Sequence, residues 1–267
     1  MVYFVGAGPG DVELITVKGM RILGMADCII YAGSLINTEL LNYTKSGCSL
    51  YNSAKMTLEE VMGVMLENER RGLCTVRLHT GDPSVYGAVR EQIDILAENS
   101  VTYEVIPGVS SFAGAAATLG AEYTLPGISQ TVILTRMEGR TPVPERERIQ
   151  ELAKIQASMA IFLSSGMLAE LSAGLVEGGY PKDTPAAIVY KATWPDEKII
   201  RTTVADLPEA GAANNISKTA IILVGNFLGN EYERSFLYNP GFTHGYRTGM
   251  GDTMGPFTKR SEIIGNE

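Results

Sequence analysis

Short apolar runs alternate with helix-forming stretches over the first 119 residues, and this alternation restricts the chain to a small set of folds. Strands are expected at four apolar runs: 2–5, 28–31, 74–79 and 103–106. Between them, Thr57 and Glu60 have the spacing of a capping box, and apolar residues then recur at helical spacing. Further helices are expected over 85–96 and 112–119. The pattern predicts an α/β lobe with a mostly parallel sheet covered by helices on both faces.

The second half of the chain has its own strands and helices. Five strands are expected, at 131–135, 159–164, 186–190, 199–203 and 220–225. Helices are expected over 145–155 and 168–177, and the turn around Trp194 indicates an antiparallel hairpin. We therefore expect two α/β lobes with a ligand-binding cleft between them. The predicted boundaries are an N-terminal αβα lobe over 1–119, a hinge over 120–129, a C-terminal α/β lobe over 130–237 and a flexible tail over 238–267.

Composition argues against several classes of function. The 267 residues carry a formal net charge of −8, whereas nucleic-acid binding needs a dense positive surface. No apolar run approaches the roughly 18 residues of a membrane span, and the N-terminus lacks the pattern of a signal peptide. The 3 cysteines form no CxxC pair and only 2 histidines are present. We therefore expect a cytoplasmic protein with no metal site, no membrane and no nucleic-acid partner.

The first strand leads into the loop GAGPGD, which at first sight looks like a dinucleotide-binding loop. Its third glycine, Gly10, comes one residue too early for the G-x-G-x-x-G spacing. A phosphate cradle also needs backbone N–H donors, but Pro9 has none, and Asp11 places a negative charge where a phosphate would lie. The loop therefore argues against a Rossmann fold. Two interpretations stay open: a tight strand-to-helix turn, or a backbone that approaches a ligand closely.

Two more loops of small residues follow strands of the first lobe. TGDPSVYG (80–87) follows the third expected strand, and PGVSS (107–111) follows the fourth. Loops at the carboxyl ends of parallel strands share one edge of the sheet, where ligands bind in open α/β sheets. Three such loops at one edge predict a ligand site. Within it, Asp82 precedes Pro83 and serves as a helix cap, a ligand contact or both.

Taken together, VGAGPGD, GDPSVYG and PGVSS resemble the motifs of the tetrapyrrole methylase family, whose members use S-adenosylmethionine in cobalamin and sirohaem biosynthesis. The resemblance extends from Val2 to about Phe227. One departure is His79-Thr80, where relatives often have Lys-Gly. Three further segments resemble the members that methylate C11 of precorrin-4 or of its cobalt form: Gln130–Glu145, IYAGSLIN (30–37) and FTHGYR (242–247).

The resemblance implies two αβα lobes with the active-site cleft between them, which is not a Rossmann fold. It also implies a homodimer that binds S-adenosylmethionine, the methyl donor, and a tetrapyrrole substrate. The residues that it assigns to the donor are Pro9, Gly81, Asp82, Val85, Ser110 and Ser111 in the first lobe, and Leu163, Ala192 and Ala220 in the second.

The carboxylates of a tetrapyrrole need cations, and four arginines lie between positions 136 and 148. Arg136 and Arg140 follow a strand on a Gly/Pro-rich loop, so we predict that they bind the substrate. Arg146 and Arg148 alternate with glutamates and are expected to form a solvated, charge-paired helix face. Further cations near the same sheet edge are alternatives, with surface solubility as their default role: Lys18, Arg21 and Arg90.

Methyl transfer from a sulfonium has a neutral leaving group, so its main requirement is alignment of the two reactants. The catalytic residues stay unassigned, and the candidates for handling a proton are Asp11, Glu138 and His79. Asp11 alternatively caps the helix that begins near Glu13, and His79 is alternatively a structural histidine. The predicted function is C11 methylation. The alternatives are methylation of another ring position within the same family, and a tetrapyrrole carrier without catalytic activity.

Overall fold

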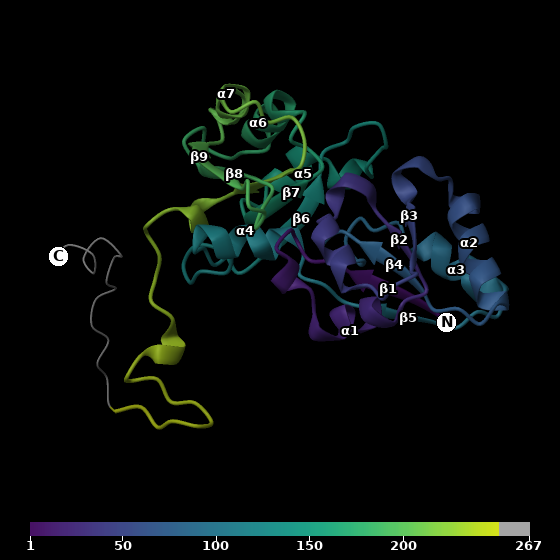
Figure 1. Ribbon diagram of the computed structural model, residues 1–267. Helices are drawn as coiled ribbons and strands as arrows, with labels where there is room; N and C mark the ends of the chain where they lie inside the picture. The colour runs from purple at the N-terminus through teal and green to yellow at the C-terminus, as the bar shows by residue number, and fades with distance from the viewer. Residues whose placement is uncertain (251–267) are drawn as a thin grey trace. The chain divides into compact units, whose positions relative to one another are not determined.

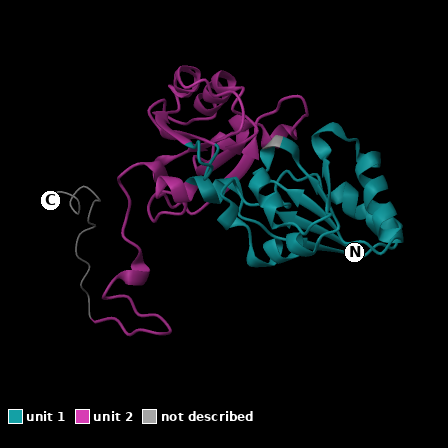
Figure 2. Cartoon of the chain, in the orientation of Figure 1, with its two compact units in different colours: residues 1–115, 191–197 teal, residues 116–190, 198–267 magenta. Residues whose placement is uncertain are grey.

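The computed structural model describes residues 1–250 of the chain, which divides into two compact units (Figure 1). Unit 1 comprises residues 1–115 and the short segment 191–197 (Figure 2). Unit 2 comprises residues 116–190 and the described residues from 198 onward. The predicted tail over 238–267 is described only as far as residue 250, so its last part, 251–267, lies outside the described residues.

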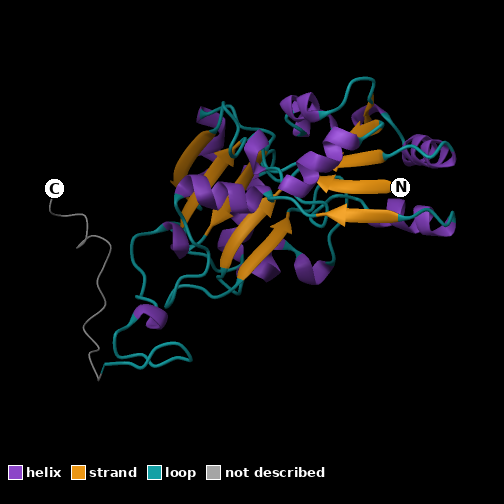
Figure 3. Ribbon diagram, turned by 60° about the horizontal axis from the view of Figure 1, so that its bottom comes forward, coloured by secondary structure: helices purple, strands orange, loops and turns teal. Residues whose placement is uncertain are grey.

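Unit 1 is built on a five-stranded sheet with the order β3-β2-β4-β1-β5. Its strands are β1 (Val2–Gly6), β2 (Cys28–Tyr31), β3 (Ser49–Asn52), β4 (Thr75–His79) and β5 (Tyr103–Ile106). All neighbouring pairs run parallel, which confirms the expected parallel sheet (Figure 3). The sequence did not reveal β3, because all of its residues are exposed at the sheet edge and carry no apolar pattern.

Helices cover both faces of the first sheet. They are α1 (Val17–Met25), α2 (Leu58–Arg70) and α3 (Arg90–Glu98), and α4 (Ser111–Leu119) follows β5. α1 packs on the face that carries Val5 and Leu78, whereas α2 and α3 pack on the face that carries Phe4 and Ile30. Successive strand residues point to opposite faces, so burial on both faces requires strands that are apolar along their length.

The prediction of a helix over 85–96 was wrong at its start, because α3 begins only at Arg90. Tyr86 and Ala88 have φ values of 54° and 49°, which lie in the left-handed region and end any helix. Between them, a Cβ on Gly87 would lie 2.2 Å from the Pro83 carbonyl oxygen. Residues 83–88 therefore form a compact turn ahead of the helix.

Unit 2 contains a mixed five-stranded sheet with the order β6-β7-β10-β8-β9. Its strands are β6 (Val132–Arg136), β7 (Ser158–Phe162), β8 (Pro185–Tyr190), β9 (Lys198–Thr203) and β10 (Ala220–Val224). β6 and β7 are parallel, and the other neighbours are antiparallel. β8 and β9 form the hairpin that was expected around Trp194.

One face of this second sheet is covered by α5 (Ile149–Ala153), α6 (Leu168–Glu177) and α7 (Leu207–Ala213). They pack against Met159, Ile188 and Ile222 from the three central strands. The expected helix over 145–155 is interrupted, because Arg148 has an extended backbone with a ψ value of 148°. The sequence reading did not anticipate α7. Among residues 1–250, no helix combines the length and the apolar character that a bilayer crossing requires.

Core packing on the first sheet yields a stability prediction. Met65 lies on α2 and is fully buried against the sheet, whereas Met20 on α1 is 39% exposed. We expect Met65→Ala to lower the free energy of unfolding by about 2 to 5 kcal/mol, because it leaves a cavity. Met20→Ala, the same change at an exposed helix position, should cost well under half as much. Urea unfolding followed by circular dichroism measures both, and equal losses would contradict the assigned packing.

Candidate active site

The three small-residue loops of unit 1 meet at one edge of the first sheet, as predicted. β4, β1 and β5 are adjacent strands, and each loop continues from the carboxyl end of one of them. Gly81 N donates to Gly8 O at 2.9 Å, and Gly8 N donates to Gly81 O at 3.3 Å. Gly108 N donates to the Asp82 carboxylate at 2.7 Å. The loops are therefore joined directly to one another by hydrogen bonds.

The glycines of these loops serve close approach between backbones. A Cβ on Gly108 would lie 2.2 Å from Gly81 O, and a Cβ on Gly6 would lie 2.6 Å from the Gly108 Cα. Both distances are far below van der Waals contact, so side chains at these positions would push the three loops apart. The role of the glycines in GAGPGD is thereby explained in part. Gly6 of that loop, together with Gly108, allows the three loops to pack against one another.

Asp82 braces two of the loops. One carboxylate oxygen accepts from Gly108 N, and the other accepts from the backbone N and the hydroxyl of Ser84. Partial burial acts to raise the pKa of Asp82, but these hydrogen bonds outweigh it and hold the pKa below its usual value. The carboxylate is therefore ionised near neutral pH. Its contact with a ligand stays a prediction.

Other residues predicted to contact the donor lie in the same place. A Cβ on Gly81 would lie 3.5 Å from the Ser110 Cα and 3.6 Å from the Ser111 N. The Ser110 carbonyl accepts from two backbone N–H groups in the first turn of α4. Pro9 is buried and lies close to Gly114 of the same helix. The structure thus brings Pro9, Gly81, Asp82, Ser110 and Ser111 together, with Val85 in the turn after Asp82.

The segment 191–197 also belongs to this edge of unit 1. Trp194 Nε1 donates to Pro9 O at 2.9 Å, and Asp11 N donates to the Thr193 hydroxyl at 3.0 Å. Ala192, which the resemblance assigns to the donor, is buried within the segment. The roles of Thr193 and Trp194 were not predicted from the sequence. One sequence feature could have indicated a role for Trp194: it is the single tryptophan of the sequence, and it lies in a predicted hairpin turn.

Left-handed backbone at residues other than glycine marks the same loops. Nine such residues occur in the described chain. Three of them directly follow helices, where this conformation is an ordinary way to end: Ser100, Gln156 and Asn215. Five of the other six lie at or directly beside positions assigned to the donor: Tyr86, Leu163, Lys191, Thr193 and Thr219. The sixth, Ala88, lies three residues after Val85. Strained backbone of this kind clusters at functional sites, so its distribution supports the assignment.

In unit 2, the two residues assigned to the donor share one edge of the second sheet. Ile161 pairs with Ile222 in the antiparallel ladder of β7 and β10. Leu163 directly follows the last residue of β7, and Ala220 is the first residue of β10, so both lie at the same end of this antiparallel pair. Leu163 is 66% exposed although it is apolar, and its φ value is 53°. An exposed leucine held in a left-handed conformation is a candidate ligand contact.

The arginines predicted to bind substrate differ in their surroundings. The Arg136 guanidinium donates to three backbone carbonyls of the loop that follows β6: those of Met137, Thr141 and Pro142, at 2.8 to 3.1 Å. Arg136 therefore fixes the shape of this loop. Arg140, at its centre, is exposed, and among the described residues no hydrogen bond or ion pair engages its guanidinium. Arg140 is thus the arginine of this loop that is available to an anionic ligand.

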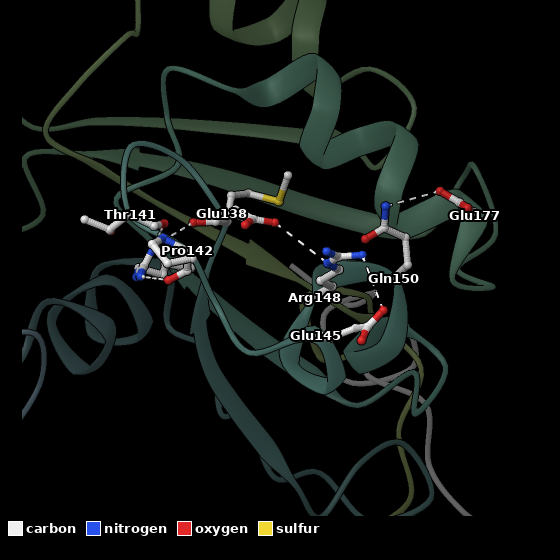
Figure 4. Close-up of polar contacts among 9 residues, drawn as sticks. Glu138, Thr141, Pro142, Glu145, Arg148, Gln150 and Glu177 are labelled. Carbon is white, nitrogen blue, oxygen red and sulfur yellow. Dashed lines mark hydrogen bonds and ion pairs between the residues drawn. The ribbon is translucent and has the colours of Figure 1, made fainter.

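Glu138 and Arg148 lie beside this loop and form an ion pair (Figure 4). The Arg148 guanidinium lies 3.7 Å from a Glu138 carboxylate oxygen and 3.9 Å from one of Glu145. Arg146 lies 3.8 Å from Glu147. Arg146 and Arg148 therefore pair with neighbouring glutamates as predicted, but not on a continuous helix face, because the extended Arg148 separates the turn Glu145–Glu147 from α5. Such exposed pairs contribute little to stability.

Two of the candidate acid–base residues have clear structural roles. The Asp11 carboxylate accepts from Glu13 N at 2.9 Å and caps the turn Val12–Leu14. His79 ends β4 and is 4% exposed, and its Nε2 has no hydrogen-bond partner among the described residues. Burial, assisted by the nearby Arg77 charge, lowers the pKa of His79 to about 3. A general base working near pH 7 needs a pKa close to that pH, so this geometry favours a neutral, structural histidine.

The fold defines a two-sheet α/β protein, and the strained, small-residue edge of its first sheet is a candidate ligand site. Comparison with known proteins gives its family. Residues 1–208 match the family described as Tetrapyrrole (Corrin/Porphyrin) Methylases. The cobalt-precorrin-4 C(11)-methyltransferase of Methanocaldococcus jannaschii is 53% identical over 247 residues, which cover 92% of this chain and 95% of that relative. This chain belongs to the tetrapyrrole methylase family.

Two solved structures are similar to this chain. One is the X-ray structure of a cobalamin biosynthetic enzyme, a cobalt-precorrin-4 methyltransferase, with a TM-score of 0.83 and 50% identity. It covers 85% of this chain and 95% of its own. The other is the uroporphyrin-III C-methyltransferase of Thermus thermophilus in complex with S-adenosyl homocysteine, with a TM-score of 0.72 and 25% identity over 85% of this chain and 93% of its own. The predicted α/β fold of this family is thereby confirmed.

The neutral state of His79 leads to a pH prediction. An unfolded histidine takes up a proton near pH 6.5, whereas the buried one does not until about pH 3. The unfolded state therefore binds more protons in this range, and stability falls by about 1.4 kcal/mol for each pH unit of acidification. We expect His79→Gln to remove this contribution between pH 6 and pH 4. Urea unfolding at several pH values measures the slope, with His244→Gln as the matched control. Equal slopes in all three proteins would contradict a buried, neutral His79.

Proposed function

We propose that this protein is an S-adenosylmethionine-dependent methyltransferase that methylates C11 of precorrin-4 or cobalt-precorrin-4 during corrin-ring biosynthesis. The observation that carries the proposal is the edge of unit 1, where three glycine-bearing loops and strained residues coincide with the positions that the family assigns to its donor. The relative from Methanocaldococcus jannaschii, which this chain matches at 53% identity over 95% of its length, is named a cobalt-precorrin-4 C(11)-methyltransferase. This name favours C11 over other ring positions.

The residues of this edge fit a sulfonium donor. The loops over 6–11, 80–89 and 107–111 contain the carboxylates of Asp11 and Asp82 and no lysine or arginine. Such a surface suits a ligand with a positive sulfur and opposes a pyrophosphate. The donor-binding residues that we propose are Pro9, Gly81, Asp82, Val85, Ser110, Ser111 and Ala192 in unit 1, and Leu163 and Ala220 in unit 2. The solved relative from Thermus thermophilus, in complex with S-adenosyl homocysteine, supports this choice of ligand class.

S-adenosylmethionine supplies a methyl group whose departure leaves a neutral thioether. The protein is then required mainly to orient the acceptor carbon and to exclude water, which explains why alignment by rigid loops replaces a set of catalytic side chains. Asp82 contributes by fixing two loops through its carboxylate. His79 is buried and has a low pKa, and the Asp11 carboxylate caps a turn. Glu138, which is exposed, is therefore the candidate proton carrier with the most solvent access.

The substrate carries several carboxylates, and we assign their recognition to the loop after β6. Arg140 provides a free guanidinium there, and Arg136 positions the loop through three carbonyls. We further propose that the chain works as a homodimer in the cytoplasm. The family resemblance supports both statements, and the unpaired cysteines Cys28, Cys48 and Cys74 suit a reducing compartment.

The direct test is methyl transfer to defined substrates. The purified protein is incubated with isotope-labelled S-adenosylmethionine and with precorrin intermediates, with and without cobalt, and the products are analysed by mass spectrometry. We expect the gain of one methyl group on the precorrin-4 stage. Transfer to an earlier intermediate would assign another ring position, and donor binding without transfer to any tetrapyrrole would contradict the proposed activity.

The two ligand sites should separate by mutation. We expect Arg140→Ala to raise the KM for the tetrapyrrole roughly tenfold, because a charge-assisted contact is lost, while the Kd for S-adenosylhomocysteine stays unchanged. Asp82→Ala should instead weaken the binding of S-adenosylhomocysteine, because the hydrogen bonds that join two loops are lost. Arg146→Ala, which removes an exposed arginine paired only with its neighbour, is the matched control. An unchanged KM in Arg140→Ala would remove Arg140 from the substrate site.

A further inference from the structure

The segment 191–197, which we call the latch, is held on the glycine-rich loop by side chains that lie outside the sequence motifs described above. Trp194 Nε1 donates to Pro9 O at 2.9 Å, and the Thr193 hydroxyl accepts from Asp11 N at 3.0 Å. Pro9 and Asp11 contribute backbone atoms to these two hydrogen bonds, so the contact depends on the backbone conformation of the loop and not on its side chains. Two hydrogen bonds therefore hold both ends of the stretch from Pro9 to Asp11.

The shape of the contact surface also matches the indole ring. A Cβ on Gly10 would lie 2.0 Å from Trp194 Cδ1 and 2.4 Å from its Nε1. The backbone of Gly10 thus packs directly on the indole, and no other residue type fits there without moving it. On the next helix, a Cβ on Gly114 would lie 3.0 Å from Pro9 and 3.2 Å from the Thr193 methyl group. Gly10 and Gly114 together leave the space that the latch and Pro9 occupy.

The latch itself is strained and internally braced. Lys191 and Thr193 have φ values of 47° and 69°, on either side of the buried Ala192. Thr193 N donates to the Glu197 carboxylate at 2.6 Å, and Lys191 pairs with Asp196 at 2.6 Å. The Lys191 ammonium also lies 5.2 Å from the centre of the Trp194 ring, within range of a cation–π contact. Left-handed residues persist only where the surroundings hold them, and here the surroundings are the latch and the loop.

We propose that Trp194 and Thr193 are positioning residues for the methyl donor: by locking the latch to Pro9, Gly10 and Asp11, they fix Ala192 and Pro9 in the arrangement that binds it. This inference rests on the proposed function, because it takes Pro9 and Ala192 as donor contacts. Neither Trp194 nor Thr193 itself needs to touch the donor. Gly10 provides the surface on which the indole of Trp194 packs.

The test uses Trp194 as its own reporter, because it is the 1 tryptophan of the chain. Gly10→Ala adds a methyl group against the indole, and Gly63→Ala adds the same group on α2, where nothing lies within 4 Å. We expect Gly10→Ala to shift tryptophan emission to longer wavelength and to weaken S-adenosylhomocysteine binding at least tenfold by calorimetry. Gly63→Ala should change neither the emission nor the Kd. Circular dichroism and thermal unfolding confirm that each variant is folded.

A second variant guards against a folding defect in Gly10→Ala. Thr193→Val keeps the shape and branching of the side chain but cannot accept from Asp11 N, so the Kd should rise roughly threefold to tenfold. A double-mutant cycle then tests the mechanism. Because the indole is absent from Trp194→Ala, adding Gly10→Ala to it should cause no further loss of binding. Independent, additive losses would overturn the assigned contact.

The outcomes separate the latch from the function. If the wild-type protein does not bind S-adenosylhomocysteine, the proposed function fails and the variants are not needed to show it. If the wild type binds and Gly10→Ala shifts the emission without weakening binding, the latch proposal alone is overturned. An unshifted emission in a folded Gly10→Ala protein would also overturn it, because the indole would then not rest on Gly10.

Discussion

The close approach of three backbones at the carboxyl edge of the first sheet is the constraint on which the rest of the site depends. Gly8 and Gly81 exchange two hydrogen bonds, and Gly6 and Gly108 lie too close to the neighbouring loops to carry a side chain. Backbone amides are rigid and carry no rotamer freedom, so a surface built from them loses little entropy when a ligand binds. The fold places these loops side by side because β4, β1 and β5 are adjacent and parallel.

The compact edge costs conformational free energy, because several of its residues adopt strained backbone conformations. Left-handed conformations at Tyr86, Ala88, Lys191 and Thr193 each disfavour folding locally. Hydrogen bonds offset the strain: Gln92 donates to the Ala88 carbonyl at 2.9 Å, and Glu197 accepts from Thr193 N. Gln92 is in turn held by the buried Arg77, whose pKa is lowered to about 10 by burial. The polar groups beneath the site therefore serve mainly to hold its loops in shape.

The sequence predicted the parts of the fold that depend on local pattern. Apolar runs and the capping box at Thr57 are local sequence patterns, and the strands and the helix start that they predicted are present in the structure. It did not predict β3, whose edge position leaves it exposed, or the start of α3, which the left-handed conformations of Tyr86 and Ala88 delay. The roles of Trp194 and Arg136 also escaped it. Each depends on contacts formed only in the folded chain, Trp194 with Pro9 far away in sequence and Arg136 with the carbonyls of a folded-back loop.

Charge is distributed between the two units in a way that the net value of −8 conceals. The loops over 6–11, 80–89 and 107–111 carry Asp11 and Asp82 and no cation, and Lys191 of the latch is paired with Asp196. The loop after β6 in unit 2 presents the guanidinium of Arg140, which no described residue engages. A cationic donor and a polyanionic acceptor attract each other in solution but need opposite surroundings in a protein. Under the proposed function, the acidic loops of unit 1 suit the cationic donor, and the loop that carries Arg140 suits the polyanionic acceptor. Arg136 holds that loop in shape through three carbonyls. Local placement of charge, and not overall composition, therefore determines what an acidic protein of this kind can bind.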